Sequence, residues 1–207
     1  MIRRYLILGV LAALVLAAQI VVPQTAAYMT PSASAASCPA VEVVFARGRL
    51  ESPGVGVLGN AFINALRSKS NKNIGVYAVK YPADNEIDVG ANDMSGHIQY
   101  MAGNCPNTRL VLGGYSLGAG VTNRVLNDPL PQGVDDRIVA VALFGNASRL
   151  LDVPLAPGPE FDGKSIDVCN PGDPICSGGP FALSHLQLAY VAGGGVNSAV
   201  EFAMSKL

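Results

Sequence analysis

The residues best suited to chemistry form a G-x-S-x-G motif that spans Gly114–Gly118. The motif lies between a predicted strand and a predicted helix, which is the setting in which its serine acts as a nucleophile. A sharp turn there exposes Ser116 at the helix N-terminus, where free N–H groups stabilise a developing negative charge. Glycines at both ends of the motif remove side chains that would collide across the turn. The pattern therefore predicts a nucleophilic serine; the alternative is a glycine-rich turn in which Ser116 caps the helix.

A serine hydroxyl needs a general base, and the chain contains two histidines, His97 and His185. Where a G-x-S-x-G turn supplies the nucleophile, an acidic residue and then the histidine follow it along the chain. His97 precedes Ser116 and falls within a predicted helix, so we interpret it as a surface or helix-packing residue. His185 stands in the right order, and we predict that it is the base.

The base in turn needs a carboxylate that orients it and stabilises its charged form. Asp173 is the best candidate because it follows a predicted strand at the carboxyl end of the sheet, where active-site loops gather. Cys169 and Cys176 enclose it, and a bond between them would fix its backbone. The other acidic residues between Ser116 and His185 are Asp128, Asp135, Asp136, Asp152, Glu160, Asp162 and Asp167. This chemistry requires no metal and no organic cofactor, and we expect none.

The first 36 residues have the pattern of a secretory signal. Arg3 and Arg4 form a basic region, an apolar run over 5–22 follows, and Ala33-Ser34-Ala35 matches an A-x-A cleavage site. We predict cleavage near residue 35 or 36, no membrane anchor afterwards, and a secreted protein that is extracellular or associated with the cell envelope. The alternatives are an uncleaved anchor, since about 18 apolar residues is the lower limit of a membrane span, and, less favoured, a lipid-modified Cys38.

All four cysteines follow the signal: Cys38, Cys105, Cys169 and Cys176. An even number of cysteines in an exported chain predicts two disulfides, and four cysteines allow three pairings. The segment between Cys169 and Cys176 is rich in turn residues that can bring the two together, which favours that pair with Cys38–Cys105. A zinc site is disfavoured because no two cysteines have the spacing of zinc ligands.

Short β-branched runs alternate with amphipathic segments along the rest of the chain. Strands are predicted at residues 41–46, 74–79, 109–112, 138–144 and 165–169. Helices are predicted at 55–70, 93–101, 117–126 and 196–206, the second with Asn92 as its N-cap. This alternation predicts an α/β domain over residues 37–207, with a mainly parallel sheet of about five strands and helices on both faces. The Pro- and Gly-rich segment 150–163 is predicted to be a surface loop.

The composition argues against an intrinsically disordered protein and against a nucleic-acid-binding protein. Half of the 207 residues are hydrophobic, 14% are charged, and the formal net charge is -1. Such a chain is not intrinsically disordered, because it has ample apolar surface to bury. A near-neutral charge also argues against nucleic acid as the main partner. We expect one domain that works as a monomer.

Taken together, the motifs resemble the cutinase family of serine esterases, and within it the mycobacterial cutinase-like proteins. The resemblance covers the chain from Cys38 to its end and rests on four segments: Val44–Gly48, Gly113–Gly118, Cys169–Cys176 and His185–Tyr190. It implies a lidless α/β-hydrolase that cleaves carboxylic esters with a surface-exposed serine. The family's triad falls on Ser116, Asp173 and His185, and its two disulfides match the pairing favoured above.

Two positions depart from the family pattern. Leu117 replaces the glutamine that commonly follows the nucleophile, but its backbone N–H can still donate to the oxyanion. Arg49 replaces the serine or threonine of the first loop, so its N–H remains while a hydroxyl donor is lost. The guanidinium could substitute for that donor or could pair with Glu51. Asn85 resembles the residue that supports the first-loop hydroxyl, and its task without that hydroxyl is open.

These observations predict a secreted serine carboxylesterase that hydrolyses short- to medium-chain acyl esters or lipids through an acyl-enzyme. Phe181, Leu183 and Leu186 flank His185 and are predicted to contact the acyl chain, with a place in the hydrophobic core as the alternative. Two rival functions remain. One is a phospholipase, thioesterase or acyltransferase that acts on envelope lipids with the same triad. The other is a secreted binding module whose site is impaired by the lost hydroxyl at Arg49.

Overall fold

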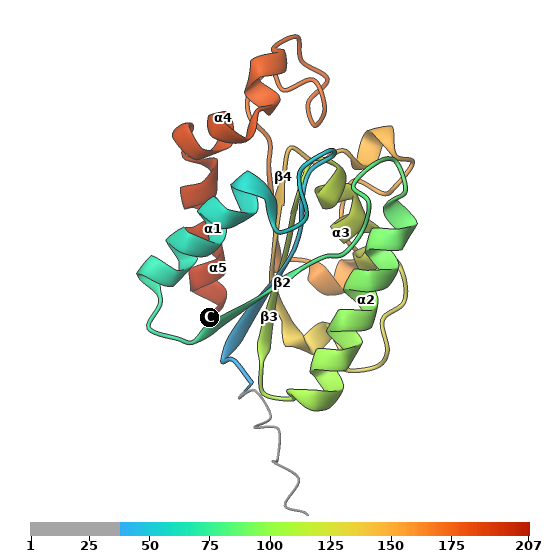
Figure 1. Cartoon of the computed structure of the whole chain (residues 1–207), viewed down its shortest axis with the longest axis vertical. Helices are drawn as coiled ribbons and strands as arrows, with labels where there is room; N and C mark the ends of the chain where they lie inside the picture. The colour runs from blue at the N-terminus through green and yellow to red at the C-terminus, as the bar shows by residue number, and fades with distance from the viewer. Residues whose placement is uncertain (1–37) are drawn as a thin grey trace, which may run out of the picture. The chain divides into compact units, whose positions relative to one another are not determined.

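A five-stranded parallel sheet organises the computed structural model, which describes residues 38–207 (Figure 1). The strands are β1 (Val41–Ala46), β2 (Ile74–Ala78), β3 (Arg109–Tyr115), β4 (Ile138–Phe144) and β5 (Ser165–Val168). Their spatial order is β2-β1-β3-β4-β5, and every neighbouring pair is parallel. The prediction of a mainly parallel sheet of about five strands is confirmed. Because the strand order reverses between β1 and β3, a crevice is expected at their carboxyl ends.

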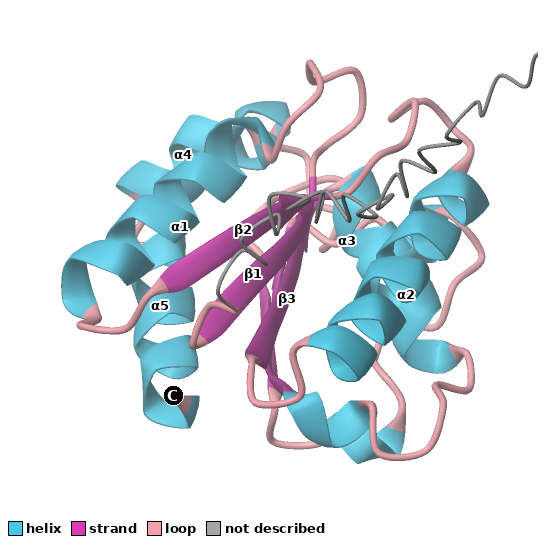
Figure 2. Ribbon diagram, turned by 60° about the horizontal axis from the view of Figure 1, so that its bottom comes forward, coloured by secondary structure: helices cyan, strands magenta, loops and turns pink. Residues whose placement is uncertain are grey.

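Helices cover both faces of this sheet (Figure 2). On one face, α2 (Ile87–Asn104) packs beside α3 (Leu117–Asn127). On the other face lie α1 (Gly56–Lys69), α4 (Gln187–Ala192) and α5 (Gly195–Lys206). The helices thus form two outer layers, as expected where parallel strands are joined by helical crossovers.

A buried hydrophobic cluster on each face holds these layers together. In β1, Val44 and Ala46 belong to the cluster under α2 and α3, whereas Val43 and Phe45 belong to the cluster under α1 and α5. This alternation follows from the two-residue period of a strand. All six residues of β1 are buried, and all but Glu42 are apolar; β4 is wholly apolar, as expected for strands covered on both faces.

The strand that carries the motif is longer than the sequence predicts. β3 extends to Tyr115 because Gly113 and Gly114 continue the pairing with both β1 and β4, although glycine has low strand propensity. A Cβ on Gly113 would lie 2.8 Å from the Phe45 ring, so the absent side chain leaves room for that ring. The hydrophobic pattern alone could not place this strand end.

Helix boundaries differ from the sequence pattern in two places. α2 begins at Ile87, so Asn92 lies inside the helix and the prediction that it is the N-cap was wrong. In the added first turn, Gly90 is buried, and a Cβ there would lie 3.1 Å from atoms of Tyr81 and Val121. α4 was not predicted, and the loop over 150–163 contains a short 3-10 turn.

The structure contains both disulfides that the sequence favours. Cys38–Cys105 ties the segment before β1 to the end of α2, and Cys169–Cys176 closes the loop after β5. The predicted signal over residues 1–36 lies outside the described residues. From residue 38 to the C-terminus, none of the helices combines the length and the apolar character that crossing a membrane would take.

Candidate active site

The turn between β3 and α3 presents Ser116 in a strained conformation. Ser116 has φ 53° and ψ -113°, a positive φ that a residue with a side chain rarely adopts. A Cβ on Gly114 would lie 2.2 Å from the Gly118 carbonyl oxygen, and a Cβ on Gly118 would lie 2.0 Å from the Ala46 carbonyl oxygen. The two glycines of the motif are therefore required at this turn, as the sequence predicts. They let α3 begin directly against the end of β1.

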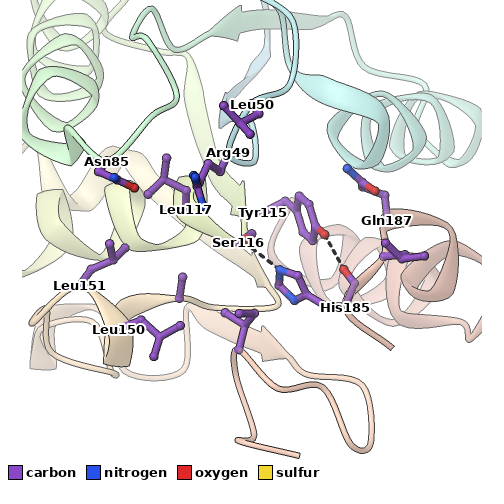
Figure 3. Close-up of a pocket in the computed structure, with 13 residues that line it drawn as sticks. Arg49, Leu50, Asn85, Tyr115, Ser116, Leu117, Leu150, Leu151, His185 and Gln187 are labelled. Atoms are coloured by element: carbon purple, nitrogen blue, oxygen red, sulfur yellow. Dashed lines mark hydrogen bonds between the residues drawn. The ribbon is translucent and has the colours of Figure 1, made fainter. Parts of the chain in front are cut away.

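The structure brings the three predicted triad residues within hydrogen-bond distance of one another. Figure 3 shows two of them, Ser116 and His185, joined by a hydrogen bond. His185 Nε2 lies 2.9 Å from Ser116 Oγ, and His185 Nδ1 lies 2.8 Å from Asp173 Oδ2. Ser116 comes from the β3–α3 turn, Asp173 from the loop after β5, and His185 from a 3-10 turn over Ala182–His185. This chain of hydrogen bonds lets the imidazole accept the serine proton while the carboxylate holds it in place.

Asp173 is fully buried, and each of its carboxylate oxygens has two hydrogen-bond donors. Oδ2 accepts from His185 and from the Tyr190 hydroxyl at 2.6 Å, and Oδ1 accepts from the N–H groups of Ile175 at 2.7 Å and Cys176 at 3.3 Å. Burial raises the pKa of Asp173, but the hydrogen bonds from Tyr190, His185 and Ile175 outweigh it and hold the pKa below its ordinary value. Asp173 is therefore ionised wherever His185 can act as a base.

Two tyrosines that the sequence analysis left without a role support this arrangement. The Tyr115 hydroxyl donates to the backbone carbonyl of His185, and the two rings stack with centroids 5.3 Å apart. Tyr190 is fully buried and supplies the second donor to Asp173 Oδ2. Burial is the main cause that raises the pKa of both tyrosines far above the usual range, so both stay protonated as donors. The two rings also pack edge to face with centroids 6.1 Å apart, so Tyr115 holds the histidine backbone and its neighbour Tyr190 holds the carboxylate.

The loop after β1 is held firmly beside the serine. The buried Arg47 guanidinium donates to the carbonyl oxygens of Glu51 and Tyr81 at 2.8 and 2.7 Å, and the Leu50 N–H donates to Ala83 at 2.8 Å. Among the described residues, the N–H groups of Arg49 and Leu117 donate to no protein acceptor. Two donors at the end of β1 and the start of α3 are what an oxyanion hole requires.

The Glu51 carboxylate is occupied by backbone groups. It accepts from the N–H of Gly48 at 2.6 Å and from the N–H of Val57 at 2.9 Å. The structure has no ion pair between Glu51 and Arg49 within residues 38–207. The alternative that Arg49 pairs with Glu51 was therefore wrong, because the carboxylate accepts hydrogen bonds from backbone N–H groups instead.

A pocket of about 460 Å³ opens over Ser116 and His185 (Figure 3). Its walls come from the loops that follow the strands and from the start of α4. The lining residues are Arg49, Leu50, Asn85, Tyr115, Ser116, Leu117, Ala147, Leu150, Leu151, Ile175, His185, Leu186 and Gln187. Sequence reasoning missed most of the apolar wall, because the loop that contains Leu150 and Leu151 carries no motif.

The predicted acyl contacts need a correction. Leu186 lines the pocket, but Phe181 and Leu183 do not. Phe181 is 63% exposed with its ring close over Gly172, and Leu183 is 75% exposed, because both lie on the outer side of the turn that carries His185. The alternative of a place in the core is also wrong, since Leu186 is 50% exposed. Asn85 does line the pocket, with its side chain exposed and with no hydrogen bond to a described residue.

The second histidine, His97, makes packing contacts with neighbouring side chains. His97 lies in α2, and its Nε2 is 2.8 Å from Glu42 Oε2 while its ring stacks on Tyr77 at 3.5 Å. These contacts agree with the interpretation of His97 as a helix-packing residue. Within the described part of the chain, no group of three or more His, Cys, Asp or Glu side chains is placed to hold a metal ion.

Removal of either disulfide should lower stability, but only removal of Cys169–Cys176 should lower activity. Replacing Cys169 and Cys176 by serine should lower the free energy of unfolding by about 2.5 kcal/mol and should also reduce kcat, because the loop that fixes Asp173 loosens. Replacing Cys38 and Cys105 should cost more stability, about 4.4 kcal/mol, because that loop is longer. The kcat of this second variant should be unchanged, since the Cys38–Cys105 bond lies at the amino ends of the strands. Urea unfolding measures the stability of the two variants, and kcat is measured at low temperature, where both stay folded. Equal losses of kcat in the two variants would contradict the role given to the Cys169–Cys176 bond.

Comparison with known proteins places the chain among esterases. A cutinase family model matches residues 37–207. The probable carboxylesterase Culp2 of Mycobacterium tuberculosis is 52% identical, with 99% of this chain and 97% of that protein covered. The phospholipase Culp4 of the same organism is 48% identical, with 86% and 83% covered. Among solved structures, Trichoderma reesei cutinase with a phosphonate inhibitor has a TM-score of 0.65 and 34% identity, with 80% of this chain and 77% of that chain covered.

Proposed function

This chain belongs to the cutinase family and is a carboxylic ester hydrolase; on that premise we propose that it is a secreted serine esterase whose catalytic triad is Ser116, His185 and Asp173. The observation that carries the proposal is the pair of hydrogen bonds of 2.9 and 2.8 Å that links the three side chains at the base of an open pocket. Geometry of this kind is what identifies a triad, whatever the chain order.

The reaction follows from the roles of these groups. Ser116 Oγ attacks the ester carbonyl carbon while His185 Nε2 takes the hydroxyl proton. The tetrahedral intermediate then breaks the bond to the alcohol oxygen, and His185 returns the proton to the leaving alcohol. Water, activated by the same histidine, attacks the acyl-enzyme and releases the carboxylic acid and free Ser116. The N–H groups of Leu117 and Arg49 stabilise the oxyanion in both steps.

The pocket supports an acyl group of short to medium length. Ala147, Leu150, Leu151 and Ile175 form an apolar wall beside the serine, and the pocket volume is about 460 Å³. Burial of a methylene group gains about 0.8 kcal/mol, so activity should rise with chain length until the wall is covered. Leu150 is 62% exposed, which keeps the pocket open to solvent at its rim.

Secretion rests on features outside the catalytic site. The basic and apolar pattern of residues 1–36 is typical of an export signal, and the family match begins directly after it, at residue 37. Two disulfides favour an oxidising compartment. Expression of the full chain with mass analysis of the exported product measures the cleavage site. Recovery of an intact N-terminus in the membrane fraction would contradict cleavage.

Two measurements test the esterase proposal. A series of p-nitrophenyl esters from acetate to palmitate should give a maximum of kcat/KM between butyrate and octanoate. A fluorophosphonate should label the exported protein, and peptide mapping should place the label on Ser116. A folded protein that turns over no ester and takes no label would instead support the binding module with an impaired site.

A phospholipase is the second candidate, and a specific observation favours it. The phospholipase Culp4 is 48% identical to this chain, and the pocket combines an apolar wall with one cationic side chain. The same triad would then cleave the acyl ester of a phospholipid. Release of fatty acid from a phospholipid in mixed micelles measures this activity directly.

A further inference from the structure

We propose that the Arg49 side chain forms an anion-binding subsite in the ester pocket, where it recognises a phosphate or carboxylate group on the alcohol portion of the substrate. The inference rests on the proposed esterase function and adds a substrate class to it. Arg49 thus has two separate parts in the site: its backbone N–H faces the oxyanion, and its guanidinium selects the substrate.

The charge of Arg49 is not matched by any acidic group of the described residues. Arg49 is exposed, and none of the ion pairs in residues 38–207 includes it. Its nearest acidic neighbour along the chain, Glu51, is satisfied by two backbone N–H groups. Asp84, beside Asn85 in the facing loop, accepts from the N–H of Glu86 at 2.8 Å. A cation at this place is therefore available to a ligand.

Arg49 differs from the other residues that line the pocket in its charge. Apart from His185, which must be neutral to act as a base, Arg49 is the one lining residue that can carry a charge. Figure 3 shows its side chain in the part of the pocket near Leu117 and Asn85. The loop beneath it is fixed by Arg47 and by the Leu50–Ala83 hydrogen bond. The fixed backbone keeps the origin of the Arg49 side chain at the edge of the pocket that contains Ser116.

The pocket is chemically two-sided. Leu150, Leu151 and Ile175 suit an acyl chain, whereas Arg49 and Asn85 offer hydrogen-bond donors on another part of the wall. The guanidinium presents a planar fork of donors that matches the two oxygens of a carboxylate or phosphate. With the acyl chain on the apolar wall, an acidic group on the alcohol reaches the donors. A neutral alcohol would leave them in water without gain.

A ratio of specificity constants tests the proposal. The probes are monobutyrylglycerol phosphate and neutral monobutyrylglycerol, with butyrate release followed for both. In Arg49→Gln, the ratio of kcat/KM for the phosphate ester over the neutral ester should fall about fivefold, mainly through KM. Any disturbance of the oxyanion hole affects both esters alike and cancels in the ratio. Arg49→Lys keeps the charge but not the planar fork, so it should retain only part of the selectivity. Added salt should weaken the selectivity in the native protein.

A matched control removes the same charge elsewhere. Arg137 lies just before β4, at the amino ends of the strands and away from the pocket, so Arg137→Gln should leave the ratio unchanged. An equal fall of the ratio in Arg137→Gln and in Arg49→Gln would show a general charge effect and would overturn the subsite. An unchanged ratio in Arg49→Gln would also overturn it.

A second pair of probes tests which part of the substrate carries the anion. Ethyl hydrogen succinate has its carboxylate on the acyl side, and ethyl butyrate is its neutral counterpart. Selectivity for the succinate that depends on Arg49 would overturn the assignment to the alcohol portion. If the native protein hydrolysed neither neutral ester and took no fluorophosphonate label, the failure would belong to the proposed esterase function, not to the subsite.

Discussion

Ser116→Ala should remove nearly all esterase activity and leave the protein folded. The expected loss in kcat is on the order of 10⁶, because in the proposed mechanism Ser116 Oγ is the atom that forms the covalent bond to the substrate. Alanine lacks only the Oγ atom, and the strained turn is held by glycines and by the hydrogen bond from the Ser116 N–H to Phe144. Urea unfolding should therefore give a midpoint close to that of the native protein.

The same measurement applies to His185→Ala and to the double variant that combines it with Ser116→Ala. His185→Ala should lose about as much activity as Ser116→Ala, because neither group works without the other. The double variant should be no less active than either single variant, since the residual rate comes from the oxyanion hole and from binding alone. Losses that multiply in the double variant would show that the two side chains act independently. Appreciable turnover by pure Ser116→Ala would show that another serine carries the reaction.

The sequence was sufficient to select the three residues of the proposed triad, because each leaves a signal in a local motif or in its order along the chain. Gly114 and Gly118 indicate the turn. His185 is then selected over His97 because it follows Ser116 along the chain. Asp173 was recognisable from its place after a strand and between two cysteines. The sheet was predictable for a similar reason, since a strand buried on both faces, such as β4, has a continuous apolar sequence, and β1 departs from this pattern only at Glu42.

Other parts of the site depend on contacts between distant segments, which no local pattern encodes. Tyr190 reaches Asp173 across 17 positions, and Tyr115 reaches the carbonyl of His185 across 70. The exposure of Phe181 and Leu183 depends on which side of a 3-10 turn they occupy, and an apolar residue type does not fix that side. The interaction that satisfies Glu51 involves backbone N–H groups, which are the same for every sequence.

Asp173→Asn should reduce kcat by about 10⁴ while the fold persists. The reason lies in the four hydrogen bonds around the carboxylate. The N–H groups of Ile175 and Cys176 both point at Oδ1, so the amide oxygen of asparagine must take that place. Its NH₂ group then occupies the position of Oδ2, where it donates to His185 Nδ1. The imidazole proton is forced onto Nε2, which can no longer accept the proton of Ser116.

The pH dependence of stability gives a second readout of the same variant. The pKa of Asp173 is lower in the folded protein than its ordinary value of 3.8, because hydrogen bonds from Tyr190, His185 and Ile175 outweigh the opposing effect of burial. A carboxyl whose pKa falls on folding stabilises the protein above its unfolded pKa, and this stabilisation is lost as pH falls through the folded pKa. The free energy of unfolding of the native protein should therefore exceed that of Asp173→Asn at neutral pH, and the difference should shrink below about pH 4.

Asp162→Asn provides the matched control for both readouts. Asp162 is an exposed acidic residue of the loop before β5 and lies outside the ester pocket, so its replacement should leave kcat unchanged while it removes the same charge. Urea unfolding from neutral pH to pH 3 and kcat on p-nitrophenyl butyrate measure the three proteins side by side. A stability difference between native protein and Asp173→Asn that stays constant into acid would show that the Asp173 carboxylate is not favoured by the fold. Nearly full activity of Asp173→Asn would show that His185 takes its orientation from Tyr115 and not from the carboxylate, because the Tyr115 hydroxyl holds the histidine backbone in either variant.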